Sequence, residues 1–238
     1  FPMNPAVPRG FVEEFRADDP VRQGVLSHMS ENERFQLYYA IRVLLTKKIP
    51  DVRFIEIGCY AGASLAQIML AFKRTVSRVQ GFAVEPIGQP QFYKILELLK
   101  PEVTHLKLWS SEAAPVLKQR FEQDGNAAQF IFVDGDHTYE GVKKDIRDYY
   151  PLLAPGGIMM FHDFLPPLDE SNREAIYAHH ANTEPGIRRA CVEVMEGEFG
   201  AQALDIPLLY PDDPTQTQAY LPIIPGVFST IRAYRKPE

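Results

Sequence analysis

Short apolar runs alternate with longer segments of helical periodicity through the middle of the chain. An apolar run bounded by turn residues predicts a buried strand, and alternation of such runs with helices is typical of βαβ units. These units build a parallel sheet with helices on both faces. The expected strands are 52–57, 80–84, 104–108, 129–133 and 157–162, and the expected helices are 63–74, 90–99, 112–123 and 138–153.

The two ends of the chain carry weaker patterns. Proline and charged residues through 1–29 predict an arm or lid, because proline interrupts helices. The sequence Ser30-Glu-Asn-Glu33 has the form of a capping box and is followed by apolar residues at helical spacing, which predicts a helix over 31–46. After the last parallel strand the pattern predicts a helix over 185–199 and closing strands at 203–210 and 226–235.

The length of 238 residues suits one domain with an N-terminal extension. We therefore expect an N-terminal arm and helix over 1–50 and an α/β domain over 51–238, with a lid segment at about 165–184. The chain starts at Phe1 and not at Met, which indicates a piece excised from a longer chain. Aromatic residues on the 31–46 helix, if exposed, would favour a homodimer or a larger homo-oligomer.

Charge and cysteine usage narrow the partners and the compartment. The net charge of −6 is spread along the chain and basic residues form no cluster, so the footprint of a nucleic-acid-binding protein is missing and a small-molecule partner is favoured. No run approaches the ~20 apolar residues of a membrane span. Cys59 and Cys191 lie far apart, outside any Cys-x-x-Cys spacing, which indicates a reducing, cytoplasmic location.

A glycine turn follows the first predicted strand. Glu56 ends that strand, and Gly58 and Gly62 flank the turn that leads into a helix near Ser64. Glycine allows a backbone to approach a ligand closely or to adopt positive φ. The spacing Gly-x-x-x-Gly differs from the Gly-x-Gly-x-x-Gly of dinucleotide sites, and Tyr60 stands where that pattern needs its second glycine. The turn therefore predicts a nucleotide-like ligand and disfavours a nicotinamide oxidoreductase.

Polar residues at the ends of the next two strands extend this site. Glu85 ends the second strand, where a carboxylate can accept hydrogen bonds from two ribose hydroxyls. Ser110 and Ser111 follow the third strand, where an adenine edge would lie. The structural alternative is that the glycines only form a strand-to-helix turn and that Glu85 is a solvated acid.

Acid and histidine end the fourth and fifth strands, as Asp134-Gly-Asp136-His137 and as His162-Asp163. The carboxyl ends of parallel strands meet at one sheet edge, so these side chains should converge. Asp134, His162 and Asp163 could bind a hard divalent cation such as Mg²⁺, which lowers the pKa of a bound hydroxyl. His137 could then take the proton as a general base. The structural alternatives are that Asp136 caps the following helix and that His162 is a hydrogen-bonded histidine at a strand end.

Together these motifs resemble the class I S-adenosylmethionine-dependent methyltransferases, in particular the metal-dependent O-methyltransferase branch with macrocin-type enzymes and proteins labelled cephalosporin hydroxylase. The resemblance covers about 52–164, with a weaker echo in 185–190, and rests on Glu56–Ser64, Val133–Val142 with Asp145, and Leu153–Asp163. It implies a Rossmann-like, seven-stranded, mostly parallel sheet with helices on both faces. It also implies S-adenosylmethionine across the carboxyl edge and methyl transfer to a hydroxyl.

By matching position, the resemblance implies Asp134 and Asp163 as metal ligands, His137 as the base and Glu85 as the ribose partner. The pair His162-Asp163 stands where better-characterised members have two acidic or amide ligands, which indicates a softer or weaker metal site. The expected cofactor-binding residues are Glu56, Gly58, Tyr60, Gly62, Ser64, Glu85, Ser110, Ser111 and Asp134.

The sequence therefore favours an S-adenosylmethionine-dependent O-methyltransferase that acts on a hydroxyl of a sugar, polyketide or other natural product, with Mg²⁺ or another divalent cation as second cofactor. One alternative keeps the fold and cofactor but methylates nitrogen or carbon without a metal. Another is a non-catalytic, methyltransferase-like binding or dimerisation module.

Overall fold

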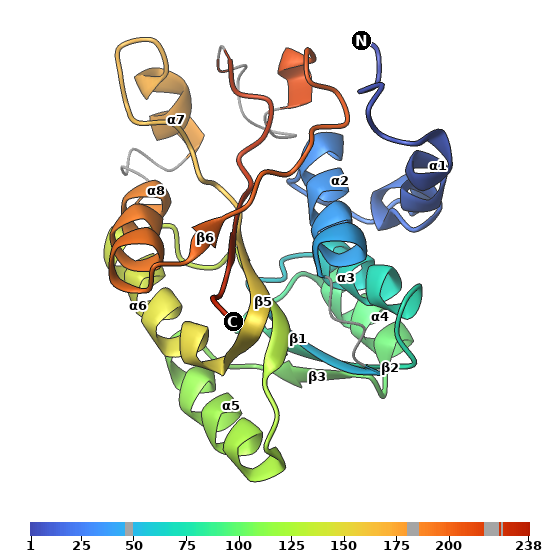
Figure 1. Ribbon diagram of the computed structural model, residues 1–238, viewed down its shortest axis with the longest axis vertical. Coiled ribbons are helices and arrows are strands. Elements are labelled where there is room, and N and C mark those ends of the chain that lie inside the picture. The colour runs from blue at the N-terminus through green and yellow to red at the C-terminus, as the bar shows by residue number, and fades with distance from the viewer. Residues whose placement is uncertain (46–49, 180–185, 217–223, 225) are drawn as a thin grey trace.

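A computed structural model of the chain describes residues 1–45, 50–179, 186–216, 224 and 226–238. Its strands form one seven-stranded sheet in the order β3-β2-β1-β4-β5-β7-β6 (Figure 1). The first five strands pair in parallel, whereas β7 is antiparallel to both β5 and β6. The expected seven-stranded, mostly parallel sheet is thus confirmed. The strands are β1 Asp51–Ile57, β2 Arg78–Val84, β3 Val103–Leu106, β4 Ala128–Val133, β5 Leu153–Phe161, β6 Gln202–Ala203 and β7 Arg232–Arg235.

Helices cover both faces of this sheet (Figure 1). One core packs α2, α3 and α4 against strand residues such as Phe54 and Phe130, and the other packs α5, α6 and α8 against their neighbours Ile55 and Ile131. Successive strand residues point to opposite faces, so strands buried on both faces read as continuous apolar runs. The helices are α1 Arg9–Ala17, α2 Glu31–Tyr39, α3 Ala63–Lys73, α4 Pro90–Leu99, α5 Ser110–Asp124, α6 Tyr139–Tyr149, α7 Arg173–His179 and α8 Ile187–Ala190.

The strand order reverses direction between β1 and β4. From β1 the chain builds outward through β2 to β3, and then crosses back to place β4 and β5 on the other side of β1. Ile57 pairs with Val133, and Val133 pairs with Phe161, so the turns that follow these three strands start side by side. Open α/β sheets bind their ligands at such a reversal, outside the carboxyl ends of the strands.

The N-terminal arm is more ordered than its prolines predict. It contains α1 and a short 3₁₀ helix, η1 Pro20–Gln23, and its Asn4 N–H donates to the carbonyl of Leu209 at 2.8 Å. The capping box at Ser30 and Glu33 is confirmed, and α2 continues as a π-helical segment, η2 Ala40–Leu44. The expected end of this helix at residue 46 lies outside the described residues.

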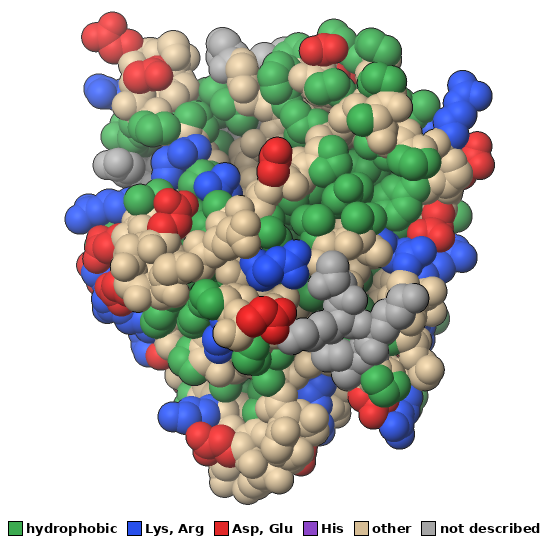
Figure 2. All heavy atoms as spheres, in the orientation of Figure 1, with side chains coloured by type: hydrophobic (Ala, Val, Ile, Leu, Met, Phe, Trp, Pro, Cys, Tyr) green, Lys and Arg blue, Asp and Glu red, His purple; other side chains and the backbone are tan. Residues whose placement is uncertain are grey.

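The aromatic residues of α2 face inward. Phe35 and Tyr38 are fully buried against Phe11 and Phe15 of α1. The expected exposure of these aromatic residues is therefore wrong, because α1 covers them, while the homodimer or larger homo-oligomer stays a prediction. Figure 2 shows apolar side chains gathered over α1, α2 and the C-terminal segment, whereas charged side chains dominate over α6 and α8.

The C-terminal strands are shorter than expected. The strand β6 covers Gln202–Ala203, so only Ala203 of the expected range 203–210 is in a strand, and of 226–235 only Arg232–Arg235 is. Backbone carbonyl groups that follow β6 accept hydrogen bonds from side chains of α2 and not from a neighbouring strand. Gln36 donates to Ile206 O at 2.9 Å, and Asn32 donates to Tyr210 O at 3.0 Å. Apolar alternation in this segment reflects packing against the core, not sheet pairing.

The expected helix over 185–199 is present as α8 and a π-helical continuation, η4 Cys191–Glu198, with residue 185 itself outside the described part of the chain. Two further 3₁₀ segments are η3 Tyr150–Leu152, which ends the expected 138–153 helix early, and η5 Pro214–Gln216. In the ranges that the structure describes, no helix has both the length and the apolarity needed to span a bilayer.

Candidate active site

A cavity of about 630 Å³ opens at the carboxyl edge of the sheet, where the strand order reverses. The turn after β1, the end of β2, the start of α5 and the turn after β4 contribute its walls. Ser110 and Ser111, at the first positions of α5, lie on the β3 side, and Asp134 lies on the β4 side. The size suits a nucleotide-like ligand, because such pockets measure roughly 300–1,000 Å³.

The glycine turn lies against the end of β4. Gly58 has φ +80°, and a Cβ at this position would stand 2.1 Å from the carbonyl oxygen of Asp134. Gly62 has φ +88° and precedes the first residue of α3. Tyr60 adopts φ +47°, which is costly for a residue with a Cβ. The ring of His28 from the arm lies 4.4 Å from that of Tyr60, so the arm covers the turn.

Glu85 ties the glycine turn to the loop after β2. Its Oε2 accepts from the N–H groups of Cys59 and Tyr60 at 2.9 and 3.0 Å, and its Oε1 accepts from those of Ile87 and Gly88 at 3.0 Å each. A carboxylate has about four accepting positions, so all are used. The expected role as ribose partner stays a prediction, and it requires ribose hydroxyls to replace some of these backbone donors.

Glu56 lies beneath the turn and is fully buried. Ser64 donates to its Oε1, while Oε2 has no hydrogen-bond partner. Burial raises the pKa of Glu56 to about 8; the bond from Ser64 opposes this shift, and the charges of Asp134 and Glu85 add to it. At neutral pH this carboxyl therefore holds a proton, which removes the cost of a buried charge.

The expected cofactor residues fall into three groups. Six of them line the main cavity, and Ser64 lines a smaller cavity of about 40 Å³ between the glycine turn and residues 26–29 of the arm. Glu56 and Gly62 line neither cavity and support the turn from below. The six that line the main cavity are Gly58, Tyr60, Glu85, Ser110, Ser111 and Asp134.

Two further lining residues were not singled out for the cofactor from the sequence. Trp109 precedes α5 and is 60% exposed at the cavity wall, where its ring offers a flat apolar surface. Asp145 of α6 is buried at the same end, and burial raises its pKa to about 6, although a bond from Ser110 opposes the shift. Its Oδ2 has no hydrogen-bond partner. In the sequence, the feature that could have identified Asp145 is an acidic residue on the apolar face of the helix predicted over 138–153.

The reaction strands bring their acids and histidines into one cluster. Asp134 Oδ1 lies 3.2 Å from His162 Nδ1 and 3.5 Å from His137 Nε2. Asp163 Oδ2 lies 3.2 Å from His137 Nδ1, and Asp163 Oδ1 lies 3.8 Å from His162 Nδ1. The expected convergence of these four side chains is therefore present, and Asp134 belongs to both the cluster and the cavity wall.

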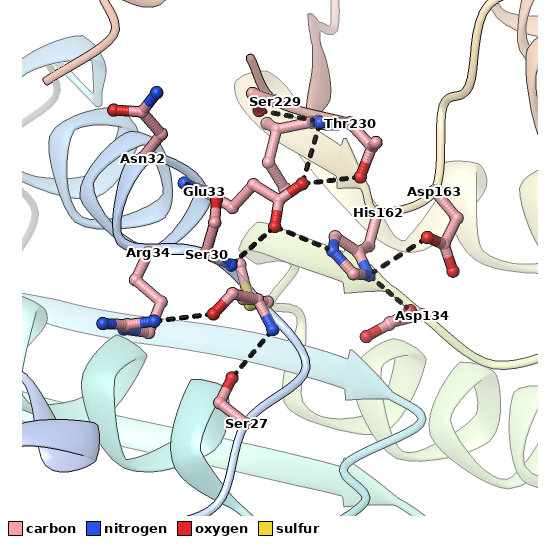
Figure 3. Close-up of polar contacts among 12 residues, drawn as sticks. Ser27, Ser30, Asn32, Glu33, Arg34, Asp134, His162, Asp163, Ser229 and Thr230 are labelled. Carbon is pink, nitrogen blue, oxygen red and sulfur yellow. Dashed lines mark hydrogen bonds and ion pairs between the residues drawn. The ribbon is translucent and has the colours of Figure 1, made fainter. Parts of the chain in front are cut away.

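A fifth residue joins the cluster from the N-terminal helix. Glu33 is fully buried, and its Oε2 lies 3.4 Å from His162 Nε2 (Figure 3). The sequence identified Glu33 only as part of a capping box, which is a sufficient local reason for a glutamate at that position. Its contact with a strand far along the chain has no sequence signal.

The carboxylates favour the protonated form of both histidines. Burial alone would lower the pKa of His162, but Asp134, Asp163 and Glu33 raise it well above 6.5. Burial also opposes protonation of His137, whose pKa is raised by Asp134 and Asp163. The pKa of Asp134 is lowered by the two histidines against the effect of burial. Without a cation, the cluster is therefore a set of charge-assisted hydrogen bonds.

The donor set fits a divalent cation. Asp134, His162 and Asp163 each offer one ligand atom, and these atoms lie within 4.8 Å of one another. Adjacent ligands of a six-coordinate ion with bonds of about 2.1 Å lie about 3 Å apart, close to the separation of His162 Nδ1 from Asp134. Glu33 on the far nitrogen of His162 matches the carboxylate–histidine–metal arrangement of many metal sites.

Asp136 belongs to the turn before α6. Its Oδ1 accepts from the N–H of Thr138 at 2.8 Å, and the cap of α6 is Thr138, whose hydroxyl accepts from Gly141. The alternative that Asp136 caps this helix is therefore wrong, because the cap residue is Thr138, although Asp136 does belong to the turn that leads into the helix. His162 is a hydrogen-bonded histidine at a strand end, as the structural alternative expects. That alternative gives no reason why three carboxylates surround its ring.

Comparison with known proteins supports the fold and its class. Residues 55–164 match the model of a family described as a methyltransferase domain, and the match spans both the glycine turn and the reaction strands. The matched stretch is a little under half of the chain, so the match is a similarity of this stretch to that family. An uncharacterized protein, R132, of Acanthamoeba polyphaga mimivirus is 22% identical over 182 residues, which is 73% of this chain and 74% of the viral protein.

Solved structures share the fold at low identity. An O-methyltransferase from Bacillus cereus in complex with SAH superposes with a TM-score of 0.54 at 16% identity, covering 98% of this chain and 93% of that one. The MycE methyltransferase from the mycinamycin biosynthetic pathway, in complex with Mg, SAH and mycinamycin VI, gives a TM-score of 0.47 at 13% identity. That superposition covers 84% of this chain but only 48% of MycE, so the chain spans about half of that protein.

Proposed function

We propose that this protein transfers a methyl group from S-adenosylmethionine to a hydroxyl of a small molecule, with Mg²⁺ or another divalent cation held by Asp134, His162 and Asp163. The observation that carries the proposal is the double position of Asp134, on the cavity wall and within 3.5 Å of both histidines. A ligand in the cavity and an acceptor at the cluster would therefore be neighbours. The match of residues 55–164 to a family described as a methyltransferase domain supports the cofactor.

The cavity residues would hold the cofactor. Gly58 gives close backbone approach beside Asp134, and the N–H end of α5 at Ser110 and Ser111 offers polar groups to a base edge. The flat ring of Trp109 gives that base a surface on which to stack. Asp145 also lines this cavity, and its buried Oδ2 has no hydrogen-bond partner among the described residues.

The two histidines have different access to an acceptor. The side chain of His137 is 32% exposed, whereas that of His162 is 3% exposed, so only His137 can meet a substrate hydroxyl. Asp163 orients its Nδ1, and the other ring nitrogen faces Asp134. S-adenosylmethionine would supply an electrophilic methyl group, and a bound cation would lower the pKa of the hydroxyl. The charge of that cation would also favour the neutral form of His137, which would take the proton of the hydroxyl.

The acceptor would lie beneath the described part, 165–179, of the segment 165–184 that we propose as the lid; 180–184 lie outside the described residues. Leu165 and Ile176 from this segment pack with Ile224 in a small apolar cluster separate from the two sheet cores. Such a cluster can exchange its contacts for an apolar ligand surface more easily than a core residue can. A sugar, polyketide or other natural product with a hydroxyl fits this arrangement.

Equilibrium titration with S-adenosylmethionine tests the cofactor half of the proposal. We expect saturable, one-site binding by calorimetry, weakened when Ser110 and Ser111 are both changed to bulky residues. No saturable binding up to millimolar concentration would refute the proposed function.

The rival function is metal-independent transfer to nitrogen or carbon on the same fold. It is favoured by the charge balance of the cluster, in which two protonated histidines already offset most of the charge of three carboxylates. Treatment with EDTA separates the two functions: loss of transfer that Mg²⁺ restores supports the metal, and unchanged transfer supports the rival.

A further inference from the structure

Glu33 makes more contacts than a capping residue needs. A capping box requires one oxygen of the glutamate to accept from the N–H of the cap residue, and here Oε2 accepts from Ser30 N at 2.8 Å. The other oxygen, Oε1, accepts from the N–H and the hydroxyl of Thr230 at 2.8 and 2.7 Å. Glu33 thus joins the first turn of α2 to the segment before β7 (Figure 3).

The same carboxylate reaches the end of β5. Oε2 lies 3.4 Å from Nε2 of His162, and both side chains are at least 97% buried, so water does not screen the contact. The backbone bonds fix Glu33 from two directions, which means that it cannot follow the imidazole if the ring moves. Glu33 is therefore a rigid support on one side of the ring.

This support decides which ring nitrogen faces the cluster. A carboxylate accepts hydrogen bonds and donates none, so the Nε2 that faces Glu33 carries a proton. Nδ1 is then the nitrogen that points toward Asp134 and Asp163, at 3.2 and 3.8 Å. If the imidazole were turned by half a rotation, Cε1 would face Glu33 and Cδ2 would face Asp134 and Asp163. The contacts of both ring nitrogens would then be lost.

We propose that Glu33 is a positioning residue of the reaction centre: it fixes the imidazole of His162 so that Nδ1 lies beside Asp134 and Asp163, and so sets the affinity of these three ligands for a divalent cation. The inference deepens the proposed function and rests on it. It makes the N-terminal helix a part of the catalytic unit, although that helix lies outside the matched methyltransferase domain.

Titration of the whole chain with Mn²⁺ alone, followed by electron paramagnetic resonance, tests the inference. Glu33→Gln keeps the oxygen that accepts from Thr230, whereas an amide nitrogen in place of Oε2 gives up the bond from Ser30 N and can donate to Nε2, which places the proton of a neutral ring on Nδ1. We expect Mn²⁺ to bind about 10–100-fold more weakly, the range for lost support of a metal-bound histidine. Affinity for S-adenosylmethionine should change less than about twofold.

Two further variants separate position from charge. Glu31→Gln removes an acid from the same helical turn, one that pairs with Arg16 at 3.1 Å, and should leave Mn²⁺ affinity unchanged. Glu33→Asp keeps the charge but withdraws the carboxylate from the ring, and it should weaken Mn²⁺ binding as Glu33→Gln does. If Glu33→Asp kept full Mn²⁺ affinity and Glu31→Gln lost Mn²⁺ affinity, the negative charge of the helix turn and not the position of the Glu33 carboxylate would control binding. That result would overturn the inference.

The wild-type protein gives a test that does not depend on folding of a variant. In protein loaded with Zn²⁺ alone and labelled with ¹⁵N-histidine, NMR should show His162 protonated at Nε2 and bound to the metal through Nδ1. Binding through Nε2, or no divalent-cation binding by wild type, would overturn the inference. Because S-adenosylmethionine binding is measured separately, its absence would refute the proposed function without deciding the role of Glu33.

Discussion

The backbone of Gly58 lies so close to Asp134 that a Cβ on residue 58 would stand 2.1 Å from the Asp134 carbonyl oxygen. The N–H of Asp134 in turn donates to Ile57 O at 2.8 Å. The cofactor turn and the first reaction residue are therefore one packed unit, and a change in one displaces the other.

Gly58→Ala should lower stability by more than about 2 kcal/mol and weaken S-adenosylmethionine binding. An alanine at φ +80° costs about 1–2 kcal/mol, and the contact with Asp134 adds to that. Urea denaturation and calorimetry measure the two effects. Gly125→Ala is the matched control, since Gly125 also has positive φ but no atom within 4 Å of its Cβ position. Equal losses in the two variants would contradict the close approach.

Glu85→Gln should destabilise the protein by about 1–3 kcal/mol. The amide nitrogen of glutamine would face two backbone N–H donors that the carboxylate now satisfies, and buried donors without acceptors cost about that much. The same change should weaken binding of S-adenosylmethionine, because the glycine turn and the loop after β2 would no longer be held together by Glu85. Glu97→Gln, at an exposed glutamate bonded to Lys100, is the control. A Glu85→Gln protein with wild-type stability would show that the four bonds are not formed together.

Stability should fall as pH rises from about 5 to about 8, in part through Glu56. Its pKa is about 8 in the folded protein and near 4.5 when unfolded, so between these values the folded state binds more protons. The sign is therefore a loss of up to about 1.4 kcal/mol per pH unit, complete above the folded pKa. Urea denaturation at pH 5.5 and 8.5 should show a smaller difference for Glu56→Gln than for wild type. An identical difference in both proteins would contradict a protonated Glu56.

Divalent-cation affinity should rise with pH. His162 has a raised pKa, so near neutrality it holds a proton at Nδ1 that a cation must displace. One displaced proton gives up to about a tenfold gain in Mn²⁺ affinity per pH unit below that pKa, and the gain ends above it. Titrations at pH 6, 7 and 8 at constant ionic strength measure the slope. An affinity independent of pH would mean that His162 is not a ligand.

Local patterns predicted most of the sheet and its helices, because each buried strand and each amphipathic helix carries its own periodicity. They failed at 203–210, where Ile206 and Leu209 are apolar for packing while their carbonyl groups bind side chains of the arm and α2. Whether a strand forms depends on which partner is adjacent, and that is set by the whole fold.

The site divides in the same way. Strand endings predicted the convergence of Asp134 and Asp163, because the carboxyl ends of parallel strands must meet, and the turn spacing predicted Gly58 as part of the cofactor site. The four backbone donors on Glu85 and the contact of Glu33 with His162 could not be predicted, since each depends on the folding of loops that are distant in sequence.

The bond from Thr230 to Glu33 also has a consequence for the order of events during translation. Glu33 is synthesised 197 residues before Thr230, the residue that holds its second oxygen. Until Thr230 is made, the glutamate lacks its second anchor and has no rigid hold on the imidazole. The centre is therefore completed by the segment before β7, so a nascent chain that has not reached Thr230 carries the cofactor turn without a fully supported reaction centre.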